Sequence, residues 1–278
     1  MASLETNINQ VNADFNSIKE AIISSGIEIA DGTKTSEYAG KINEISNSAE
    51  DIAQQKFWDS VQRNGEKTYY IYAFCGSTWG KDTFKPRYPI TAKGSSNYMF
   101  GYFNNGQPSF DLAQQLEDCG VTLDTSGSTN LSNLFTYAYV SRVPEINATG
   151  ATTALNGTFR YCEAEIIDKL ILKNDGTNTF TNTFQKATKL KKITIEGMIG
   201  NDISFSDCTL LTKTSISSIV NALKTDATGK TLTLSKVAVD KAFETEVDLN
   251  DGSASDEWIE TIRDKSNKYD GLWTISLI

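Results

Sequence analysis

The chain of 278 residues contains no histidine. Histidine is the side chain most often used as a general base near neutral pH and as a ligand for transition metals. Its absence excludes Ser-His-Asp and Cys-His catalysis and any metal site that requires imidazole. The glycine patterns with which many proteins bind nucleotides, G-x-G-x-x-G and the P-loop, are also absent. We therefore expect a non-enzymatic protein with no metal and no other cofactor.

Long apolar runs and an excess of basic residues are missing as well. The longest apolar run is far shorter than the roughly 20 residues that a membrane-spanning helix needs, and no basic region followed by an apolar stretch opens the chain. The chain has 26 basic and 35 acidic residues, and its net charge of −9 opposes the charge of a phosphate backbone. We expect neither membrane insertion nor a nucleic-acid partner.

Cysteine and proline are scarce, with four residues of each. Consecutive cysteines are more than 40 residues apart, whereas the ligands of structural zinc sites come in close pairs. The favoured interpretation is buried, reduced side chains that act as small hydrophobes, and a disulfide or metal role is the alternative. The few prolines, together with abundant Asn, Thr and Ser, indicate turn-rich β structure.

The second half of the chain carries a repeated spacing of aromatic, small and aliphatic residues. Four phenylalanines follow one another at intervals of 24, 25 and 21 residues. A small residue stands three positions after each phenylalanine, and an aliphatic residue stands eleven positions after it. A period in the low twenties is typical of leucine-rich solenoids, in which each turn buries its apolar edge against its neighbours. The predicted repeat core is Phe135, Ala138, Ile146, Phe159, Cys162, Leu170, Phe184, Ala187, Ile195, Phe205, Cys208 and Ile216.

The first 25 residues carry a heptad pattern. Apolar residues alternate spacings of four and three, with polar residues between them. A lone helix of about 20 residues with so narrow a stripe is marginal in water. The stripe is therefore predicted to contact copies of itself, a trimer being favoured because β-branched residues occupy both core positions; the alternative is a helix packed on its own domain. The predicted oligomerisation residues are Leu4, Ile8, Val11, Phe15, Ile18 and Ile22.

The segment between the N-terminal modules and the repeat is rich in aromatic residues amid glycine and asparagine. Two interpretations stay open for them. They form the core that caps the N-terminal end of the solenoid, or they line a face on which sugar rings stack. The candidate ligand-binding residues are Tyr70, Tyr72, Trp79, Tyr98 and Tyr102.

After the repeat, the spacing changes to that of an amphipathic helix. Ile216, Ile219, Val220 and Leu223 follow the i, i+3, i+4, i+7 pattern, and Thr212 or Thr214 is the predicted N-cap. The strand K-T-L-T-L-S, a further helix with Trp258 and Ile262, and the terminal G-L-W-T-I-S-L-I complete a cap. Such a unit covers the last apolar edge of a solenoid.

Two acidic groups were candidates for chemistry. Glu163, Glu165 and Asp168 lie close together in sequence, and glycan cleavage needs two carboxylates about 5 to 10 Å apart. Exposed turn positions explain these residues without any chemistry. The segment 248–257 is similar to a calcium loop, but its Gly252 is fifth from Asp248 rather than sixth. No calcium site is predicted.

Three stretches resemble segments of phage and prophage virion proteins from gut Firmicutes that carry leucine-rich-repeat-like segments of the BspA type. Residues 18–42, from I-K-E-A-I-I to Y-A-G-K-I, resemble a short module of phage tail and baseplate proteins. G-T-F-R-Y-C-E-A-E-I-I-D-K-L-I-L and T-F-Q-K-A-T-K-L-K-K-I-T-I resemble the repeat, although Ala138 and Ala187 stand where the pattern prefers cysteine. Residues 205–224, followed by G-K-T-L-T-L and G-L-W-T-I, are similar to the C-terminal cap of those proteins.

The resemblance implies a non-enzymatic virion component of a tail fibre, baseplate or tail tip, made in the bacterial cytoplasm and assembled into a phage-like particle. The implied partners are copies of the chain itself, other virion or tail proteins, and a host cell-surface glycan or protein. A host receptor-binding protein and a glycan-cleaving tailspike are the alternative functions.

These features together predict an α+β chain in five parts. They are a coiled-coil helix over residues 1–25, a small helical tail-protein module over 26–66, an aromatic-rich α/β entry region over 67–130, a BspA-like leucine-rich-repeat solenoid over 131–211, and an α/β C-terminal cap over 212–278.

Overall fold

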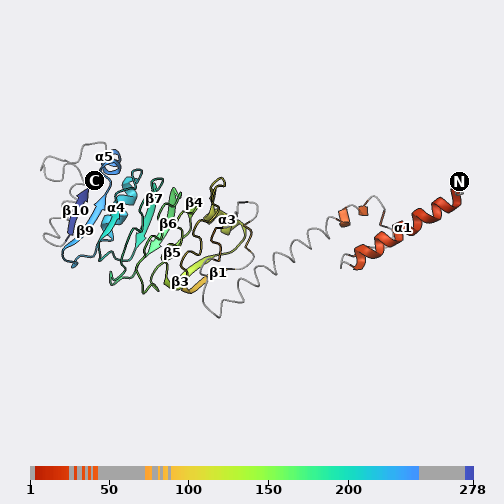
Figure 1. The fold of residues 1–278 in the computed structure, drawn as a ribbon, viewed down its shortest axis with the longest axis horizontal. Helices are drawn as coiled ribbons and strands as arrows, with labels where there is room; N and C mark the ends of the chain where they lie inside the picture. The colour runs from red at the N-terminus through yellow and green to blue at the C-terminus, as the bar shows by residue number, and fades with distance from the viewer. Residues whose placement is uncertain are drawn as a thin grey trace. The chain divides into compact units, whose positions relative to one another are not determined.

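The computed structural model describes residues 4–24, 28–29, 33–34, 37–38, 40–42, 73–76, 81, 84–86, 89–243 and 273–278. The chain divides into two compact units, Met1–Ser60 and Val61–Ile278, and the elements of both are labelled in Figure 1. Several predicted features lie outside the described residues: Tyr70, Tyr72, Trp79, most of the module over 26–66, the acidic segment 248–257 and the helix with Trp258 and Ile262.

The first unit contains helix α1 (Leu4–Ser24), whose bounds follow the predicted heptad segment. Its apolar stripe is largely uncovered, since the side chains of Ile8 and Val11 are 51% and 50% exposed. Phe15 and Ile18 are also exposed, although the Phe15 ring meets the Tyr38 ring edge-on at 6.4 Å. Among the stripe residues whose side chains the structure describes, Ile22, near the C-terminal end of the helix, is the one that is buried. The stripe therefore remains open over most of its length.

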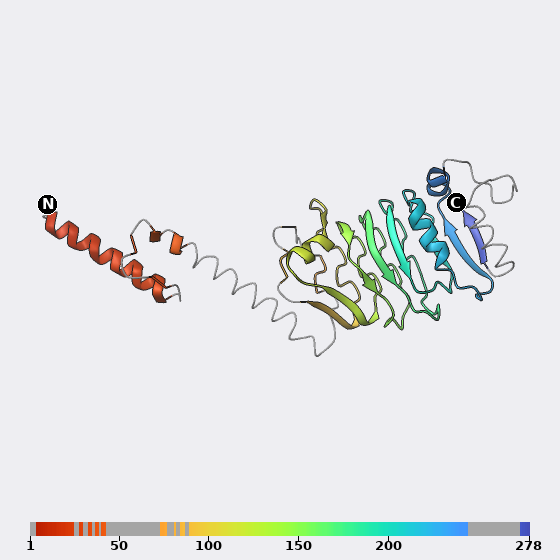
Figure 2. The same ribbon diagram turned by 180° about the vertical axis from the view of Figure 1, so that it is seen from behind.

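The second unit is a mixed α/β structure with several parallel sheets (Figures 1 and 2). The largest sheet joins β2 (Phe110–Asp111), β4 (Val140–Val143), β5 (Ile146–Asn147), β6 (Ile166–Ile171) and β7 (Lys192–Glu196). Both β4 and β5 pair with β6, and Pro144 stands in the gap between them. Proline has no N–H to donate to a ladder, so these two strands are the halves of one interrupted strand.

The aliphatic residues that recur in the predicted spacing lie opposite one another on neighbouring strands of this sheet. Ile146 lies opposite Leu170, and Leu170 lies opposite Ile195. Each of the three side chains points into the core and is buried. A separate two-stranded parallel sheet, β1 (Ile90–Ser95) with β3 (Leu123–Asn130), precedes this stack and was not predicted. Helix α3 (Leu112–Asp118) follows β2, and the Asp111 carboxylate caps it by accepting from the Gln114 N–H.

A column of phenylalanine rings runs through the core opposite the sheet. All six side chains are buried, and consecutive ring centroids are 4.9, 5.0, 6.0, 5.4 and 4.3 Å apart. Four of the six were predicted. The other two, Phe74 and Phe100, lie N-terminal to residue 131, so the same stacking continues into the predicted entry region. The column is Phe74, Phe100, Phe135, Phe159, Phe184 and Phe205.

The backbone around each phenylalanine repeats from turn to turn. The residue three positions later donates its N–H to the phenylalanine carbonyl, as Ala138 does to Phe135 and Cys162 to Phe159. Ala138, Cys162, Ala187 and Cys208 are all buried, which explains why this position takes small side chains. In the Phe100 turn the same position is filled by Phe103, so the size rule does not hold at the N-terminal end.

Two residues with positive φ flank each of the central phenylalanines. In the Phe159 turn they are Gly157 at 62° and Tyr161 at 54°, and in the Phe135 turn they are Asn133 and Tyr137 at 55° and 54°. Non-glycine residues in this region cost energy, and hydrogen bonds to the next turn hold them there. The Tyr137 N–H donates to Arg160 O, and the Tyr161 N–H donates to Gln185 O.

The C-terminal end closes the large sheet with a helix in place of a further strand beside β7. Helix α4 (Lys213–Asn221) packs beside β7 and begins at the N-cap Thr212, one of the two residues predicted. The hydroxyl groups of Ser215 and Ser218 accept hydrogen bonds from the N–H groups of Ile193 and Ile195 at 3.0 and 2.8 Å. Ile216 is buried as expected for the repeat core, but it lies on this helix rather than on a strand.

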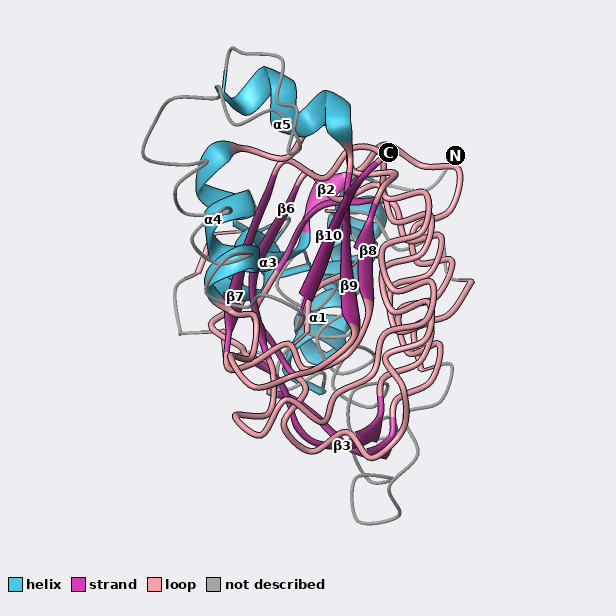
Figure 3. Cartoon of the chain, turned by 90° about the vertical axis from the view of Figure 1, so that its left-hand side faces the viewer, coloured by secondary structure: helices cyan, strands magenta, loops and turns pink. Residues whose placement is uncertain are grey.

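A third parallel sheet is formed by one strand before helix α4 and two strands after it. Its strands β8 (Ile203–Phe205), β9 (Lys230–Leu234) and β10 (Trp273–Leu277) lie in the order β10-β9-β8, and helix α5 (Lys236–Phe243) follows β9. Both β9 and β10 fall on segments predicted as strands, whereas α5 was not predicted. In Figure 3, β8, β9 and β10 lie beside the overlapping loops of successive turns, and α4 lies on the other side of the unit.

Among the helices that the structure describes, none combines the length and apolar character needed to cross a membrane.

Replacing Phe159 by alanine tests the ring column. The side chain is fully buried between Phe135 and Phe184, so its loss should lower the free energy of unfolding by about 3–5 kcal/mol. Tyr102→Ala is the control, because it removes a ring that is 40% exposed, and its effect should stay below about 1.5 kcal/mol. Urea denaturation of the full chain measures both values, and equal losses would contradict the column as a main source of stability.

Replacing Ser215 by alanine tests the closure of the sheet edge. The buried N–H of Ile193 loses its acceptor, and an unsatisfied buried donor costs about 1–3 kcal/mol. Ser217 lies on the same helix and has no hydrogen-bonding side-chain partner in the described structure, so Ser217→Ala should change stability by less than about 0.5 kcal/mol. Faster amide exchange at Ile193 in Ser215→Ala alone would identify the cause; unchanged exchange would refute it.

Candidate functional site

Tyr98 and Tyr102 are the predicted ligand-binding aromatics that the structure describes, and they do not form one open face. Tyr98 is half-buried, and Tyr102 is exposed at the end of a column of tyrosine rings. The Tyr102 ring stacks on Tyr137 at 4.9 Å, and Tyr137 stacks on Tyr161 at 4.5 Å. The Arg160 guanidinium lies 5.3 Å from the Tyr161 centroid. Because the facing sides of these rings cover one another, the column does not offer three open ring faces to a sugar.

The candidate carboxylates are each held by a cation of another turn. Asp168 accepts from Arg142 Nε at 2.6 Å, and Glu165 pairs with Lys191 Nζ at 2.7 Å. Glu163 pairs with Lys189. Charges of opposite sign therefore alternate from one turn to the next on the outer surface. This arrangement explains the three residues through contacts between turns, and it does not bring them together as one acid and base pair.

The four cysteines are free thiols. Burial raises the pKa of Cys162 to about 12 and raises the pKa of Cys208 as well. Cys75 and Cys119 are half-buried, and burial is also the main cause that raises the pKa of each. No group of three or more residues able to hold a metal ion occurs in the described part of the chain.

A polar cleft lies where the repeat shortens. The aliphatic residue of one turn and the phenylalanine of the next are separated by 13 residues from Ile146 to Phe159 and by 14 from Leu170 to Phe184, but by only 10 from Ile195 to Phe205. The interval from each phenylalanine to its aliphatic residue stays at 11. The shortening is therefore confined to the segment between Ile195 and Phe205, which in a regular repeat would lie along the Phe184 turn.

The backbone ladder stops at this shorter turn. Leu155, Gly157, Phe159 and Tyr161 donate their N–H groups to carbonyls of the following turn. The equivalent donors of the next turn are Phe180, Asn182, Phe184 and Lys186. Within residues 89–243, which the structure describes without a gap, the first three donate no backbone hydrogen bond to β8, whose described backbone pairing is with β9. A space is left between the two segments.

Hydrogen bonds close this space at both ends. At one end, Asn201 Nδ2 donates to Asn178 O at 3.0 Å and to Gly176 O at 3.3 Å. At the other end, the Lys186 N–H donates to Asp207 Oδ2 at 2.9 Å, and Lys186 Nζ lies 3.0 Å from Asp207 Oδ1. Phe184 and Phe205 stack beneath it with 4.3 Å between their centroids. The result is a short cleft with a volume of about 350 Å³.

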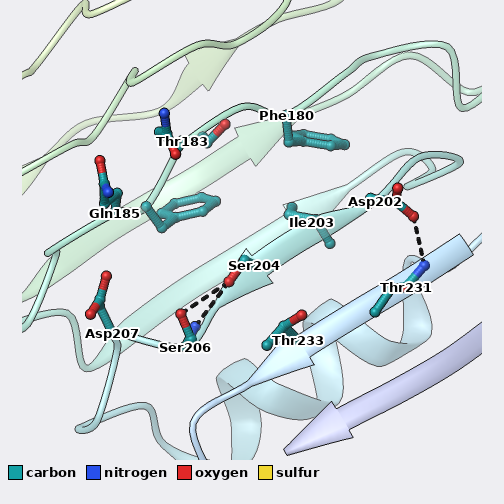
Figure 4. A pocket seen from close by; sticks show the side chains of 12 residues that line it. Phe180, Thr183, Gln185, Asp202, Ile203, Ser204, Ser206, Asp207, Thr231 and Thr233 are labelled. Atoms are coloured by element: carbon teal, nitrogen blue, oxygen red, sulfur yellow. Dashed lines mark hydrogen bonds between the residues drawn. The ribbon is translucent and has the colours of Figure 1, made fainter. Parts of the chain in front are cut away.

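Polar groups dominate the walls of the cleft (Figure 4). Figure 4 shows Phe180 and Asp202 toward one end, Gln185 and Asp207 toward the other, and Ser204 and Thr233 between them. Asp202 accepts from the Thr231 N–H at 2.7 Å, and Ser204 and Ser206 bond to each other. The hydroxyl groups of Thr231 and Thr233 have no partner among the described residues. The cleft thus offers donors and acceptors at short intervals.

Asp207 remains ionised next to this cleft. Burial acts to raise the pKa of its carboxyl, but the N–H and ammonium groups of Lys186 outweigh burial, so that the pKa is lowered. The bond to Asp207 raises the pKa of Lys186 in turn. The pair therefore fixes the end of the cleft at neutral pH and contributes little net charge to it.

A larger cavity of about 600 Å³ lies beside α3, and several of its polar groups are already engaged. Arg142 lines it and contacts both Asp168 and Asp111. Thr125 exchanges hydrogen bonds with the backbone of Asn147. We therefore take the cleft beside β8 as the candidate site. None of its residues was predicted to bind a ligand, and Phe184 was predicted only as part of the repeat core. The one signal in the sequence was the interval of 21 residues in a series of 24 and 25.

Thiol labelling tests the placement of the cysteines. In the native protein at pH 8, Cys162 and Cys208 should not react with iodoacetamide, because both are buried and burial disfavours the reactive thiolate. Cys75 and Cys119 are less buried and should react first. Peptide mass spectrometry before and after denaturation measures this, and labelling of Cys162 in the native state at the rate of Cys119 would contradict the structure.

Comparison with other proteins adds no assignment to this site. No family model, curated protein or solved structure matches the chain. The open stripe of α1, the closed parallel stack and the polar cleft are therefore the observations on which a function can be based.

Proposed function

We propose that this protein is a non-enzymatic structural component of a phage-like particle, as a tail fibre, baseplate or tail-tip attachment protein. It oligomerises through its N-terminal helix and presents the surface of its repeat unit to neighbouring subunits or to the host. The observation that carries this proposal is the exposed apolar stripe of α1. The resemblance of residues 18–42 to tail-protein modules supports the location in a virion.

The stripe fits a coiled coil of identical chains. Ile8, Val11, Phe15 and Ile18 are spaced by three, four and three residues and are all exposed. An isolated helix of 21 residues that exposes such a stripe is marginal in water. Contact with the same stripe of other copies buries it, and β-branched residues at both core positions favour three strands over two.

The second unit suits the role of a presented module. Its parallel turns, buried phenylalanines and terminal helix support the interpretation as a short BspA-type leucine-rich-repeat solenoid with a C-terminal cap. Each turn buries its apolar edge on the next. The outer side chains of adjacent turns neutralise one another, as Lys169 does with Glu145 and Glu196 at 3.2 Å each. Such a unit is rigid and does not require a partner to cover its core.

Recognition of the host surface is the second candidate function. The polar cleft beside β8 is the observation that favours it, since it leaves unpaired donors open to a ligand. The glycan-cleaving alternative has less support, because Glu163, Glu165 and Asp168 are each engaged by a different cation. Release of reducing sugar from host wall glycan would be required to maintain it.

Sedimentation of the full chain tests the oligomer. At micromolar concentration the protein should sediment as a trimer, and Val11→Asp should convert it to monomers, because the change places a carboxylate in the shared apolar seam. Asn16→Asp is the matched control, since it adds the same charge on the same helix outside the stripe, and it should remain trimeric. A monomeric wild-type chain would overturn the proposal.

A further inference from the structure

We propose that the cleft between the Phe184 turn and β8 binds one compact, neutral saccharide unit. The inference rests on the proposed function, since it specifies what a presented module would contact on a host surface. The first observation is that backbone hydrogen bonds are missing between the Phe184 turn and β8. The N–H groups of Phe180, Asn182 and Phe184 point toward the next turn by their place in the repeat, and they find no backbone acceptor in β8.

The charges around the cleft favour a neutral ligand. Asp202 and Asp207 line it, its described lining contains no lysine or arginine, and Asp207 is paired with Lys186. An anion would meet the Asp202 carboxylate and no ammonium or guanidinium group of the lining, which is unfavourable. A bare metal ion would find too few ligands, because the described residues hold no group of three metal-binding side chains. The free donors and acceptors instead match a molecule that both donates and accepts hydrogen bonds.

The closed ends favour a compact ligand over an extended peptide. A peptide strand that continued the ladder would have to pass the Asn201 contacts with Asn178 and Gly176 at one end and the Lys186–Asp207 pair at the other. Both contacts bridge the two walls directly. A volume of about 350 Å³ lies at the small end of the range for ligand pockets, roughly 300 to 1,000 Å³. A single pyranose ring fits these limits.

The composition of the walls matches the two sides of a sugar ring. The half-buried ring of Phe180 offers an apolar surface to the C–H groups. Asp202, Thr231 and Thr233 line the same cleft, so their oxygen atoms can bind hydroxyl groups of one sugar. A carboxylate accepts from hydroxyl groups, while the backbone N–H groups of Asn182 and Phe184 donate to them. The cleft therefore provides both kinds of partner that a polyol needs.

Saturation-transfer NMR on the full chain with a panel of neutral hexoses, 6-deoxyhexoses and N-acetylhexosamines tests the proposal. At least one sugar should receive saturation at millimolar concentration. Phe180→Ala and Thr233→Val should each raise its Kd by about tenfold or more, because one removes the apolar surface and the other removes a hydroxyl. Thr181→Val is the matched control, since Thr181 is an exposed threonine of the same turn that does not line the cleft; its Kd should stay within about twofold.

Three results would overturn the inference: no transfer to any sugar of the panel, a Kd that neither cleft variant changes, or binding at the cleft by inorganic phosphate or a peptide alone. Unchanged thermal unfolding of the variants shows that they are folded. The Val11→Asp chain separates this proposal from the preceding one. If it is monomeric and still binds the sugar, the cleft acts independently of the oligomer; a wild-type monomer that binds sugar refutes only the oligomer.

Discussion

The stacking of each turn on the next is the interaction on which the rest of this structure depends. A single turn can bury neither its phenylalanine nor its backbone polar groups. The contact between Phe135 and Phe159 and the bond from the Phe135 N–H to Thr158 O satisfy both requirements at once. A parallel stack built in this way always has an open last turn, whose N–H and C=O groups must find partners of another kind. The two sides of the last turn solve this problem differently. On the side of the large sheet, hydroxyl groups of Ser215 and Ser218 replace the missing strand.

On the phenylalanine side the closure is incomplete, and this is the origin of the cleft. The segment that ends in Phe205 is too short to follow the Phe184 turn along its whole length, and β8 directs its hydrogen bonds to β9. At one end the Asp207 carboxylate reaches back to the backbone, where it takes the place of a carbonyl opposite the Lys186 N–H, and at the other end the Asn201 amide donates to backbone carbonyls. The ring stack continues beneath without interruption. The stacked rings of Phe184 and Phe205 thus stabilise this end of the unit, while polar groups of the cleft above the rings have no partner within the described chain. This separation allows a binding site to exist in a scaffold that otherwise satisfies its own backbone.

The sequence predicts the parts of this fold that depend on side-chain identity at fixed intervals. The regular intervals predicted the repeated positions of Phe135, Phe159 and Phe184. They also predicted the repeated aliphatic position, whose residues Ile146, Leu170 and Ile195 lie opposite one another in the sheet. The same method missed Phe100 and Phe74, because the interval of 35 residues from Phe100 to Phe135 interrupts the period. Ile216 has the predicted spacing and is buried, but it lies on helix α4 rather than on a strand. The spacing could not distinguish the two, since a buried residue is compatible with both. The cleft could not be predicted from residue types at all. It results from residues that the shorter turn lacks, and its polar lining is ordinary for an Asn- and Thr-rich chain.

If one particle uses both features, the exposed helix determines how many clefts act together and the cleft determines how strongly each one binds. A cleft of this size engages one sugar unit through a few hydrogen bonds and one aromatic surface, and such contacts alone support only weak binding because small polar ligands exchange bonds with water. Joining three chains at α1 would present three copies of the cleft on one object. Binding of the first copy then holds the others near the same surface at an effective concentration in the millimolar range, and the gain can reach about 10² to 10⁴ over one site. A host surface repeats the same saccharide many times, so that weak individual sites and a firm oligomer are sufficient together. The heptad stripe would therefore set the strength of attachment, and the shortened turn would set its selectivity.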